Sequence, residues 1–343
     1  MLVAKPSAGT PPRVSIVIPS FNQSRYLSRT LDSILSQYYS NLELIVIDGG
    51  STDGSLEIIQ ARSSRIHYWV SEPDGGHAQA ILKGFAKATG DIMAWLNSDD
   101  FYFPWTLAVV SQIFQQFPDV DWITGRGTLG NSEGAVIREQ HDRKNMFSFL
   151  IGDYGWIQQE STFWRRSLWE RALPLILPHA SLSPMMIDSL VWCCFYRFAD
   201  IYNVNSQLAC YRQHTVNRAE QNPRLCVTET DFFISKLLSP KLSLRLRVLA
   251  HTYRFLRQLF SLFPLRILLN PISIQYIFAC IFFPPPFRVL TFCRHTDSWR
   301  QTQEPFYFKP YRPHSFRQWA QYSSSAILSL SSLLRRAFNL PSR

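Results

Sequence analysis

Hydrophobic and polar residues alternate in blocks along the first hundred positions. Four apolar runs each end in polar residues, and the segments between them repeat apolar residues every three to four positions, as Leu27 and Leu31 do. Continuous runs of this kind are typical of strands buried on both faces of a sheet. The alternation of strand and helix therefore predicts an α/β fold with a mostly parallel sheet flanked by helices. The four runs are residues 14–18, 42–48, 65–72 and 91–97.

Polar residues follow each of these four predicted strands. In parallel sheets, ligands bind in the crevice at the carboxyl ends of the strands. Four successive polar exits, three of them acidic, therefore predict a ligand site at one edge of the sheet. The exits are residues 19–22, 48–53, 72–76 and 97–100.

The alternation weakens further along the chain and predicts shorter elements. Residues 120–140 favour a hairpin, residues 161–172 a strand leading into a helix, and residues 183–214 a helix followed by a short edge pair of strands. We place these elements in one domain, residues 14–235, after a flexible lead of residues 1–13.

Charge is distributed unevenly along the chain. Residues 236–343 carry 16 of the 35 Lys and Arg residues but only 2 of the 25 acids. A basic tail indicates an anionic partner, either a nucleic acid or a lipid surface. Because aromatic and aliphatic residues lie between the charges, the pattern favours a membrane surface and no nucleic acid.

Residues 267–287 contain no charged side chain, but polar residues and three prolines at 284–286 interrupt them. A spanning helix needs about 20 predominantly apolar residues. The interruptions favour a segment that re-enters or lies on the membrane over one that crosses it. The alternative is a helical appendage, residues 236–343, that packs on the domain or forms a homodimer interface.

The sequence has neither a glycine-rich phosphate loop nor a cysteine metal site. No GxGxxG or GxxxxGK[ST] follows the first predicted strand, and the six cysteines include no CxxC pair. The cysteines are typical of reduced thiols in a cytoplasmic protein, and the lead lacks the apolar stretch of a signal peptide. Bound phosphates would therefore need a metal.

Asp99 and Asp100 stand together at the end of the fourth predicted strand, after Asn97. Adjacent carboxylates repel each other in a water-poor crevice unless a cation lies between them. Oxygen ligands suit Mg²⁺ and Mn²⁺, so the pair is a candidate site for a metal that bridges a diphosphate. The alternative is a solvated turn, where Asp is common. Asp48, at the end of the second strand, is placed to accept hydrogen bonds from a base or ribose.

Three motifs together carry a resemblance to a known family. They are P-S-F-N at 19–22, I-D-G-G-S-T-D-G at 47–54 and S-D-D at 98–100. The segment from about Arg13 to about Gln213 closely resembles the family 2 glycosyltransferases, which have the GT-A fold. The resemblance implies an inverting enzyme that uses a nucleotide-sugar, with UDP as the expected nucleotide, and a divalent metal, Mn²⁺ or Mg²⁺.

The resemblance assigns roles to single residues. Asp48 matches the acid that contacts uracil, and Asp53 matches a loop acid that serves the nucleotide or caps the next helix. Lys83 is placed to neutralise phosphate, or is an exposed helix charge. Asp99 matches the metal-binding position of the family's D-x-D motif, and Asn97 stands where many relatives carry its first Asp. The implied nucleotide-binding residues are Pro19, Ser20, Phe21, Asn22, Asp48, Asp53, Asp74, Gln79, Lys83, Asn97 and Asp99.

The resemblance also implies a catalytic base. Inverting transfer needs a carboxylate that takes the proton of the acceptor hydroxyl, and Asp188 matches that position. The alternative for Asp188 is a helix N-cap. Many relatives have a second acid where this chain has Leu190. Glu160 and Trp164 lie in a segment similar to the family's acceptor region, with core packing as the alternative for Trp164.

The Q-x-x-R-W motif of the family's processive synthases is absent, which favours transfer of a single sugar. We therefore predict a GT-A-type transferase whose basic, apolar C-terminal appendage holds it peripherally at the inner face of the cytoplasmic membrane. Glycan or lipid-linked acceptors of cell-envelope or exopolysaccharide synthesis are made there. The alternative is a catalytically degenerate sugar-nucleotide-binding subunit of a glycan-assembly complex, because Asn97 and Leu190 replace acids.

Overall fold

A computed structural model describes most of the first 240 residues and a later hairpin. The described residues are 10–140, 143–150, 157–183, 185–215, 217–238, 286–293, 296 and 298–304, with the single positions 240, 242, 244 and 248. The chain divides into two compact units, Met1–Ser243 with Phe287–Glu304, and Leu244–Pro286 with Pro305–Arg343. Only scattered positions of the second unit are described.

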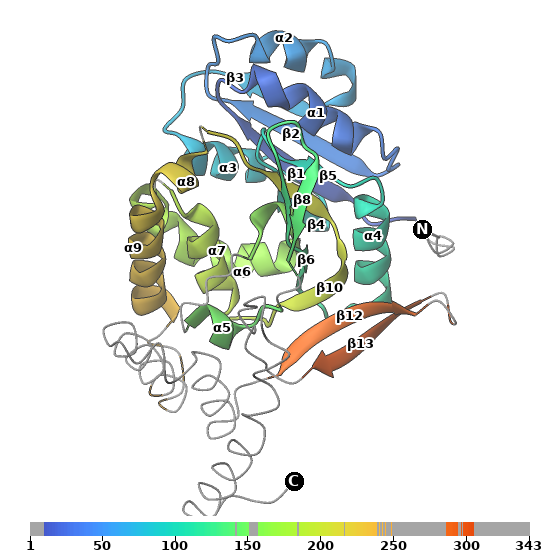
Figure 1. The fold of residues 1–343 in the computed structure, drawn as a ribbon, viewed down its shortest axis with the longest axis vertical. Coiled ribbons are helices and arrows are strands. Elements are labelled where there is room, and N and C mark those ends of the chain that lie inside the picture. Colours follow the sequence, from blue (N-terminus) through green and yellow to red (C-terminus); the bar gives the residue numbers. More distant parts are fainter. Residues whose placement is uncertain are drawn as a thin grey trace, which may run out of the picture. The chain divides into compact units, whose positions relative to one another are not determined.

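The first unit is built on a nine-stranded sheet with the strand order β13-β12-β10-β6-β9-β4-β1-β2-β3 (Figure 1). The pairs β1–β2, β1–β4, β2–β3, β6–β10 and β10–β12 are parallel, whereas β9 and β13 run antiparallel to their neighbours. The predicted α/β fold with a mostly parallel sheet is confirmed. The strands are β1 Val14–Ser20, β2 Leu42–Asp48, β3 Tyr68–Ser71, β4 Ile92–Trp95, β6 Trp122–Arg126, β9 Thr162–Arg165, β10 Tyr202–Gln207, β12 Phe287–Cys293 and β13 Ser298–Glu304.

A smaller four-stranded sheet has the order β5-β11-β7-β8. Its strands β7 and β8 form the predicted hairpin. The expected edge pair after residue 200 is wrong, because β10 lies inside the large sheet and β11 lies inside the small one. The two strands diverge at Leu208, whose buried side chain separates them. The strands of the small sheet are β5 Phe101–Tyr102, β7 Thr128–Gly130, β8 Val136–Glu139 and β11 Ala209–Arg212.

Helices cover both faces of the large sheet. On one face, apolar side chains of α1, α2 and α4 pack on alternate strand residues such as Ile16, Ile18 and Val46. On the other face, α3 approaches so closely that a Cβ at Gly84 would lie 2.3 Å from Val17 Cγ1, which explains the glycine there. The helices are α1 Ser24–Leu35, α2 Ser55–Gln60, α3 His77–Phe85, α4 Thr106–Gln116, α5 Met146–Leu150, α6 Arg166–Ile176, α7 Ile187–Phe195, α8 Arg218–Gln221 and α9 Pro223–Phe233.

Trp164 belongs to an aromatic cluster beneath the sheet. Its side chain is fully buried, and its ring centroid lies 5.4 Å from that of Trp95 and 6.0 Å from that of Trp192. The prediction that Trp164 lines an acceptor pocket is therefore wrong, and its alternative, core packing, holds. Aromatic pairs at these separations stabilise a core beyond the area they bury.

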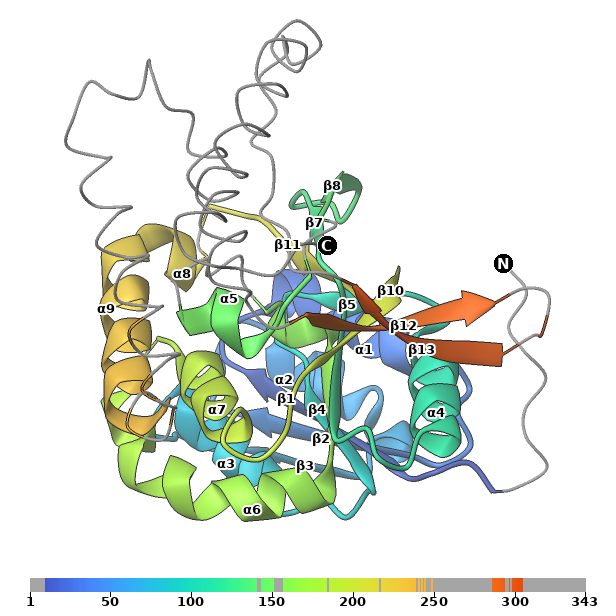
Figure 2. The ribbon, with the colours of Figure 1, turned by 90° about the horizontal axis from the view of Figure 1, so that it is seen from below.

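The hairpin of β12 and β13 corrects the predicted domain boundary at residue 236. β12 pairs in parallel with β10, and β13 is tied to α4 because Gln116 Nε2 donates to the Trp299 carbonyl at 2.7 Å. Figure 2 shows both strands beside α4. Residues 287–304 are therefore sheet and not helical appendage. Three prolines precede this segment, and its β-branched and aromatic residues favour strands.

Within the described part of the chain, no helix is both long enough and apolar enough to cross a membrane. Most of residues 267–287, and the remainder of the predicted appendage, lie outside the described residues. The membrane association, the homodimer and the flexible lead of residues 1–13 stay predictions.

Candidate functional site

Two adjoining cavities open where β1, β2 and β4 end. The strand-edge cavity, lined by Pro19, Phe21, Gly49 and Asp99 among others, has a volume of about 430 Å³. The Asp188 cavity, lined by Trp95, Gln159, Glu160 and Asp188 among others, has a volume of about 400 Å³. The predicted ligand site at this edge of the sheet therefore has two compartments. The residues that line both cavities are His77, Asn97, Met185, Tyr211 and Ala219.

Six of the predicted nucleotide-binding residues line the strand-edge cavity. Phe21 is 61% exposed, which is unusual for a large apolar side chain and leaves one face of its ring available for stacking. Gly49 lies against this ring, since a Cβ there would be 3.3 Å from Phe21 Cδ2. A flat, apolar slot of this kind fits a nucleobase. The six residues are Pro19, Ser20, Phe21, Asp74, Asn97 and Asp99.

Asp48 does not line either cavity. Its carboxylate accepts hydrogen bonds from the backbone of Gly50 and Ser51 and from the hydroxyls of Ser51 and Ser71, at 2.6 to 3.2 Å. The side chain is fully buried. In this structure Asp48 shapes the β2 exit, and the neighbouring Gly49 faces the cavity instead. Its predicted contact with uracil is not supported by this arrangement.

Asp53 and Asn22 also hold the loops together. Asp53 accepts hydrogen bonds from the Ser24 amide at 2.8 Å and from the Ser55 amide and hydroxyl at 3.1 and 2.6 Å, at the first turns of α1 and α2. Burial alone would raise the pKa of Asp53, but these hydrogen bonds outweigh it and lower the pKa. The N-cap residue of α2 is Gly54, so Asp53 is not the cap itself, but its carboxylate accepts a hydrogen bond from the first amide of that helix. Asn22 joins the β1 exit to the Ser51–Thr52 loop at 2.8 and 2.9 Å.

Lys83 and Gln79 face a separate outer cavity, which also includes Glu72. Lys83 forms an ion pair with Glu72, so its charge is already balanced. Arg218, at the start of α8, lines both this outer cavity and the strand-edge cavity. Arg218 is therefore better placed than Lys83 to meet a phosphate, and the sequence interpretation missed it.

Asp99 lies beside a histidine that the sequence analysis did not identify. The distance between Asp99 Oδ2 and His214 Nε2 is 3.0 Å, and the His214 side chain is only 3% exposed. Carboxylate oxygen and imidazole nitrogen are both ligands of Mn²⁺. Because no group of three or more His, Cys, Asp or Glu residues in the described ranges is arranged to hold a metal, this pair would need phosphate oxygens and water to complete the coordination. The pair fits a metal that binds together with a diphosphate.

Asp100 does not share this site, so the predicted pair of metal ligands is wrong for Asp100. Its Oδ1 accepts a hydrogen bond from the Arg212 amide at 2.8 Å, and its Oδ2 is buried without a hydrogen-bond partner among the residues that the structure describes. Burial, followed by the charges of Asp99 and Glu160, raises the pKa of Asp100 well above its usual value. Asp100 faces β11, so the adjacent carboxylates point to different surroundings.

Asp188 lies in the first turn of α7. It is not the N-cap, which is Met186, so the alternative interpretation of Asp188 is wrong. Its Oδ1 accepts a hydrogen bond from the Ser189 amide at 2.8 Å. Burial is the main cause that raises the pKa of Asp188 to about 6, and the charge of Glu229 adds to it. A carboxylate with this pKa is ionised at pH 7 and is a better proton acceptor than an ordinary aspartate.

Glu160 lines the same cavity as Asp188, as predicted for an acceptor residue. Its side chain is 3% exposed, and its Oε1 has no hydrogen-bond partner among the described residues. Burial is the main cause that raises the pKa of Glu160 to about 8, with the charges of Asp188 and Asp99 adding to it. Glu160 is therefore mostly protonated at pH 7 and can donate a hydrogen bond.

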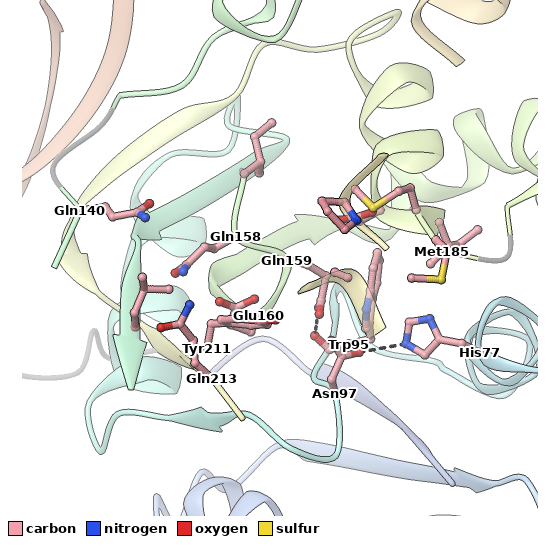
Figure 3. Close-up of a pocket in the computed structure, with 17 residues that line it drawn as sticks. His77, Trp95, Asn97, Gln140, Gln158, Gln159, Glu160, Met185, Tyr211 and Gln213 are labelled. Carbon is pink, nitrogen blue, oxygen red and sulfur yellow. Dashed lines mark hydrogen bonds between the residues drawn. The ribbon is translucent and has the colours of Figure 1, made fainter. Parts of the chain in front are cut away.

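The remaining wall of the Asp188 cavity is rich in amides. Figure 3 shows Gln140, Gln158 and Gln213 on one side of it and His77 and Met185 on the other. Gln159 Oε1 and Trp95 Nε1 are buried without hydrogen-bond partners among the described residues. Unpartnered buried donors and acceptors of this kind are satisfied by a ligand that carries hydroxyl groups.

Leu190 is fully buried in α7 and lines neither cavity. An acid at this position would lack a partner in the core. Leu190, where many relatives have an acid, therefore leaves the lining of both cavities unchanged. Asn97, in contrast, lines both cavities, and its Oδ1 lies 3.0 Å from His77 Nε2.

Comparisons with known proteins agree with this geometry. Residues 15–173 match the sequence model of Glycosyl transferase family 2. A protein of Nostoc sp. named an uncharacterized glycosyltransferase is 35% identical over 106 residues, which cover 30% of this chain and 33% of the relative. A second protein of that name from Haemophilus influenzae is 42% identical over 93 residues, 26% of this chain and 37% of the relative. The chain thus aligns with about a third of the length of these relatives.

A solved structure shares the fold over a longer stretch. The structure of residues 1–349 of TarS from S. aureus, in complex with UDP-GlcNAc, covers 77% of this chain and 76% of its own, with a TM-score of 0.53 and 15% identity. At this identity the likeness concerns the fold, which is that of the GT-A glycosyltransferases.

Proposed function

Since residues 15–173 form a domain of Glycosyl transferase family 2, we propose that this chain transfers one sugar from a UDP-sugar to a hydroxyl of a glycan or lipid-linked acceptor, with inversion at the anomeric carbon. The single observation that carries the proposal is the adjacency of the two cavities. A slot that fits a base and a diphosphate opens beside a cavity with an ionised carboxylate.

The strand-edge cavity has the features expected for a nucleoside diphosphate. Phe21 offers a ring face to the base, and Arg218 offers a positive charge to the phosphates. Asp99 and His214 would hold the divalent metal, which when bound offsets the charge that develops on the leaving diphosphate.

The Asp188 cavity has the features expected for the acceptor. The Asp188 carboxylate takes the proton of the acceptor hydroxyl as its oxygen bonds to the anomeric carbon. The bond from that carbon to the diphosphate oxygen breaks, and its electron pair leaves with the diphosphate. The unpartnered atoms of Gln159, Glu160 and Trp95 provide hydrogen bonds for sugar hydroxyls.

The proposal is tested by UDP release with Mn²⁺ or Mg²⁺ and a panel of UDP-, GDP- and TDP-sugars, with membrane extract as the source of acceptors. We expect metal-dependent turnover of a UDP-sugar that Asp188→Asn removes while nucleotide affinity is unchanged. Equal turnover by the wild type and Asp188→Asn would contradict the assigned base, and preference for a GDP-sugar would contradict the assigned nucleotide.

A second candidate function is favoured by Asn97, which puts a neutral amide where both cavities meet. A binding subunit without catalysis would bind UDP tightly and turn over no donor in the same assay. The substitution Asn97→Asp would then be expected to restore metal-dependent turnover.

We also propose that the basic, apolar residues beyond 236 hold the enzyme at an anionic membrane surface during cell-envelope or exopolysaccharide synthesis. The charge of that segment supports this. Sedimentation of the full chain with phosphatidylglycerol vesicles, but not with phosphatidylcholine vesicles, is the expected result.

A further inference from the structure

Helix α9 contacts the chain on both sides of Asp188. Glu229 Oε2 accepts hydrogen bonds from the backbone amides of Met185 and Met186, at 3.3 and 3.0 Å, immediately before α7. The hydroxyls of Thr230 and Ser189 are 2.9 Å apart, immediately after Asp188. Two neighbouring residues of α9 thus fix the segment that carries Asp188 at two points.

These contacts lie in the interior of the protein. Glu229 is 7% exposed and Thr230 is 3% exposed. A buried carboxylate is costly unless it is hydrogen-bonded, and the two amides offset part of that cost at Oε2, while Oε1 has no hydrogen-bond partner in the described part of the chain. The two amides immediately precede α7, near the positive end of its helix dipole, so a negative charge is favourable there. Glu229 lies outside residues 15–173, and none of the family motifs includes it.

We propose that Glu229 and Thr230 are positioning residues for Asp188: they fix its place in the cavity, and the negative charge of Glu229 strengthens Asp188 as a base. This proposal rests on the proposed function, in which Asp188 accepts the proton. Neither residue lines the Asp188 cavity; Thr230 lines only a neighbouring space of about 30 Å³, too small for a sugar, so both residues are assigned a role through Asp188.

The groups that interact electrostatically with Asp188 come from three elements. They are Glu229 and Cys226 of α9, Glu160 of the turn Gln159–Ser161, and Cys193 of α7. None of these groups carries a positive charge. Glu229 is the one whose charge adds to the raised pKa of Asp188. Removing this charge should lower the pKa of Asp188.

The substitution Glu229→Gln keeps an oxygen that can accept both backbone hydrogen bonds and removes the charge. Because catalysis needs ionised Asp188, we expect the acidic limb of the pH profile of kcat to move to lower pH by about half a unit. The weaker base should also lower the plateau kcat severalfold. The measurement is the rate of UDP release from pH 5 to 8.

Three further variants distinguish the effect of the Glu229 charge from the effect of the position of Asp188. Thr230→Val removes the hydroxyl that forms the hydrogen bond with Ser189, and we expect kcat to fall about tenfold while the acidic limb of its pH profile stays in place. Thr230→Ser keeps a hydroxyl and should retain most of the wild-type rate. Glu170→Gln removes an exposed charge of α6 that is not among the causes of the raised pKa of Asp188, and it should change neither quantity. Thermal unfolding confirms that each variant is folded.

If the acidic limb of the pH profile of kcat is the same for Glu229→Gln and the wild type, the electrostatic part of the proposal is wrong. If Thr230→Val and Thr230→Ser have equal kcat values, the positioning part is wrong. If the proposed function is wrong, the result is different, because the wild type itself then turns over no donor. UDP affinity, measured by calorimetry, should be the same in all variants.

Discussion

The carboxylates of the loop after β2 and those of the Asp188 cavity have opposite surroundings. Asp48 and Asp53 of that loop line neither cavity, and their carboxylates accept hydrogen bonds from nearby amides and hydroxyls. At the Asp188 cavity, Glu160 Oε1 has no partner among the described residues, and both Glu160 and Asp188 have raised pKa values.

The difference distinguishes carboxylates that stabilise a loop from carboxylates that are suited to proton transfer. A carboxylate with all its hydrogen bonds made stabilises a loop and has little tendency to take up a proton. A carboxylate that is buried with few partners destabilises the fold, and its proton affinity is suited to acid–base work at neutral pH. The loop after β2 is thus stabilised by its acids, whereas the Asp188 cavity holds acids with raised pKa values.

The largest effect is expected from Asp188→Asn. Loss of the base should lower the rate of sugar transfer about 10³-fold. In the wild type the rate should fall as the pH drops below about 6, where Asp188 takes up its proton. The rate of UDP release measures both. Asp119→Asn, an exposed acid at the end of α4, is the matched control and should retain full activity.

The next effect in size is that of Asp99→Ala. Removing one of the two proposed protein ligands should lower turnover about 100-fold and raise the metal concentration needed for half-maximal rate. Titration with Mn²⁺ is the measurement. Asp100→Asn should leave the metal requirement unchanged because Asp100 faces β11. If the two variants need the same metal concentration, Asp99 is not a ligand.

A smaller effect, on stability, is expected from Glu160→Gln. The folded state raises the pKa of Glu160 to about 8, so its stabilising contribution is complete below pH 4.5 and is lost as the pH rises to 8. The amide does not ionise. We therefore expect the melting temperature of Glu160→Gln to exceed that of the wild type by about 2 °C or more at pH 8.5, with the difference disappearing near pH 5. Calorimetric scans at both pH values decide this.

The smallest effect should come from Asp53→Ala, which removes the hydrogen bonds that the carboxylate accepts from the Ser24 and Ser55 amides. We expect a loss of about 1 kcal/mol in the free energy of unfolding, with UDP affinity unchanged. The folded state lowers the pKa of Asp53, so the stability it provides is present at pH 7 and is lost as the pH falls below about 4. A large loss of UDP affinity at unchanged stability would place Asp53 in the nucleotide site instead.

Much of the fold could be predicted from local pattern. Apolar runs gave β1, β2, β3 and β4 because strands buried on both faces need continuous apolar sequence. Their polar exits predicted the strand-edge cavity, and six of its expected residues line it. The β12–β13 hairpin, whose strands have seven residues each, was missed because the basic and apolar composition of the C-terminal segment was interpreted as that of an interfacial helix, and the partner strand β10 lies far away in sequence.

The direction of side chains was harder to predict than their position. Asp99 and Asp100 lie in a turn after β4, in which Asp99 lines the strand-edge cavity while Asp100 accepts a hydrogen bond from the Arg212 amide of β11. His214 and Glu229 are single polar residues without a motif around them, and only the packing of β11 and α9 gives them a role. A useful signal for His214 was its place at the end of a short apolar run, where the other strand exits also carry functional groups.

The β12–β13 hairpin also bears on how the protein is made. Tyr202 of β10 and Arg288 of β12 face each other across 86 positions of sequence. At the usual rate of translation, roughly 4 to 17 s pass between the synthesis of the two strands. During that interval the edge of β10 presents unpaired backbone groups, which is a template for pairing with another chain. A chain terminated near residue 243 keeps that edge open permanently, so its solubility in the cell depends on residues that lie far from either cavity.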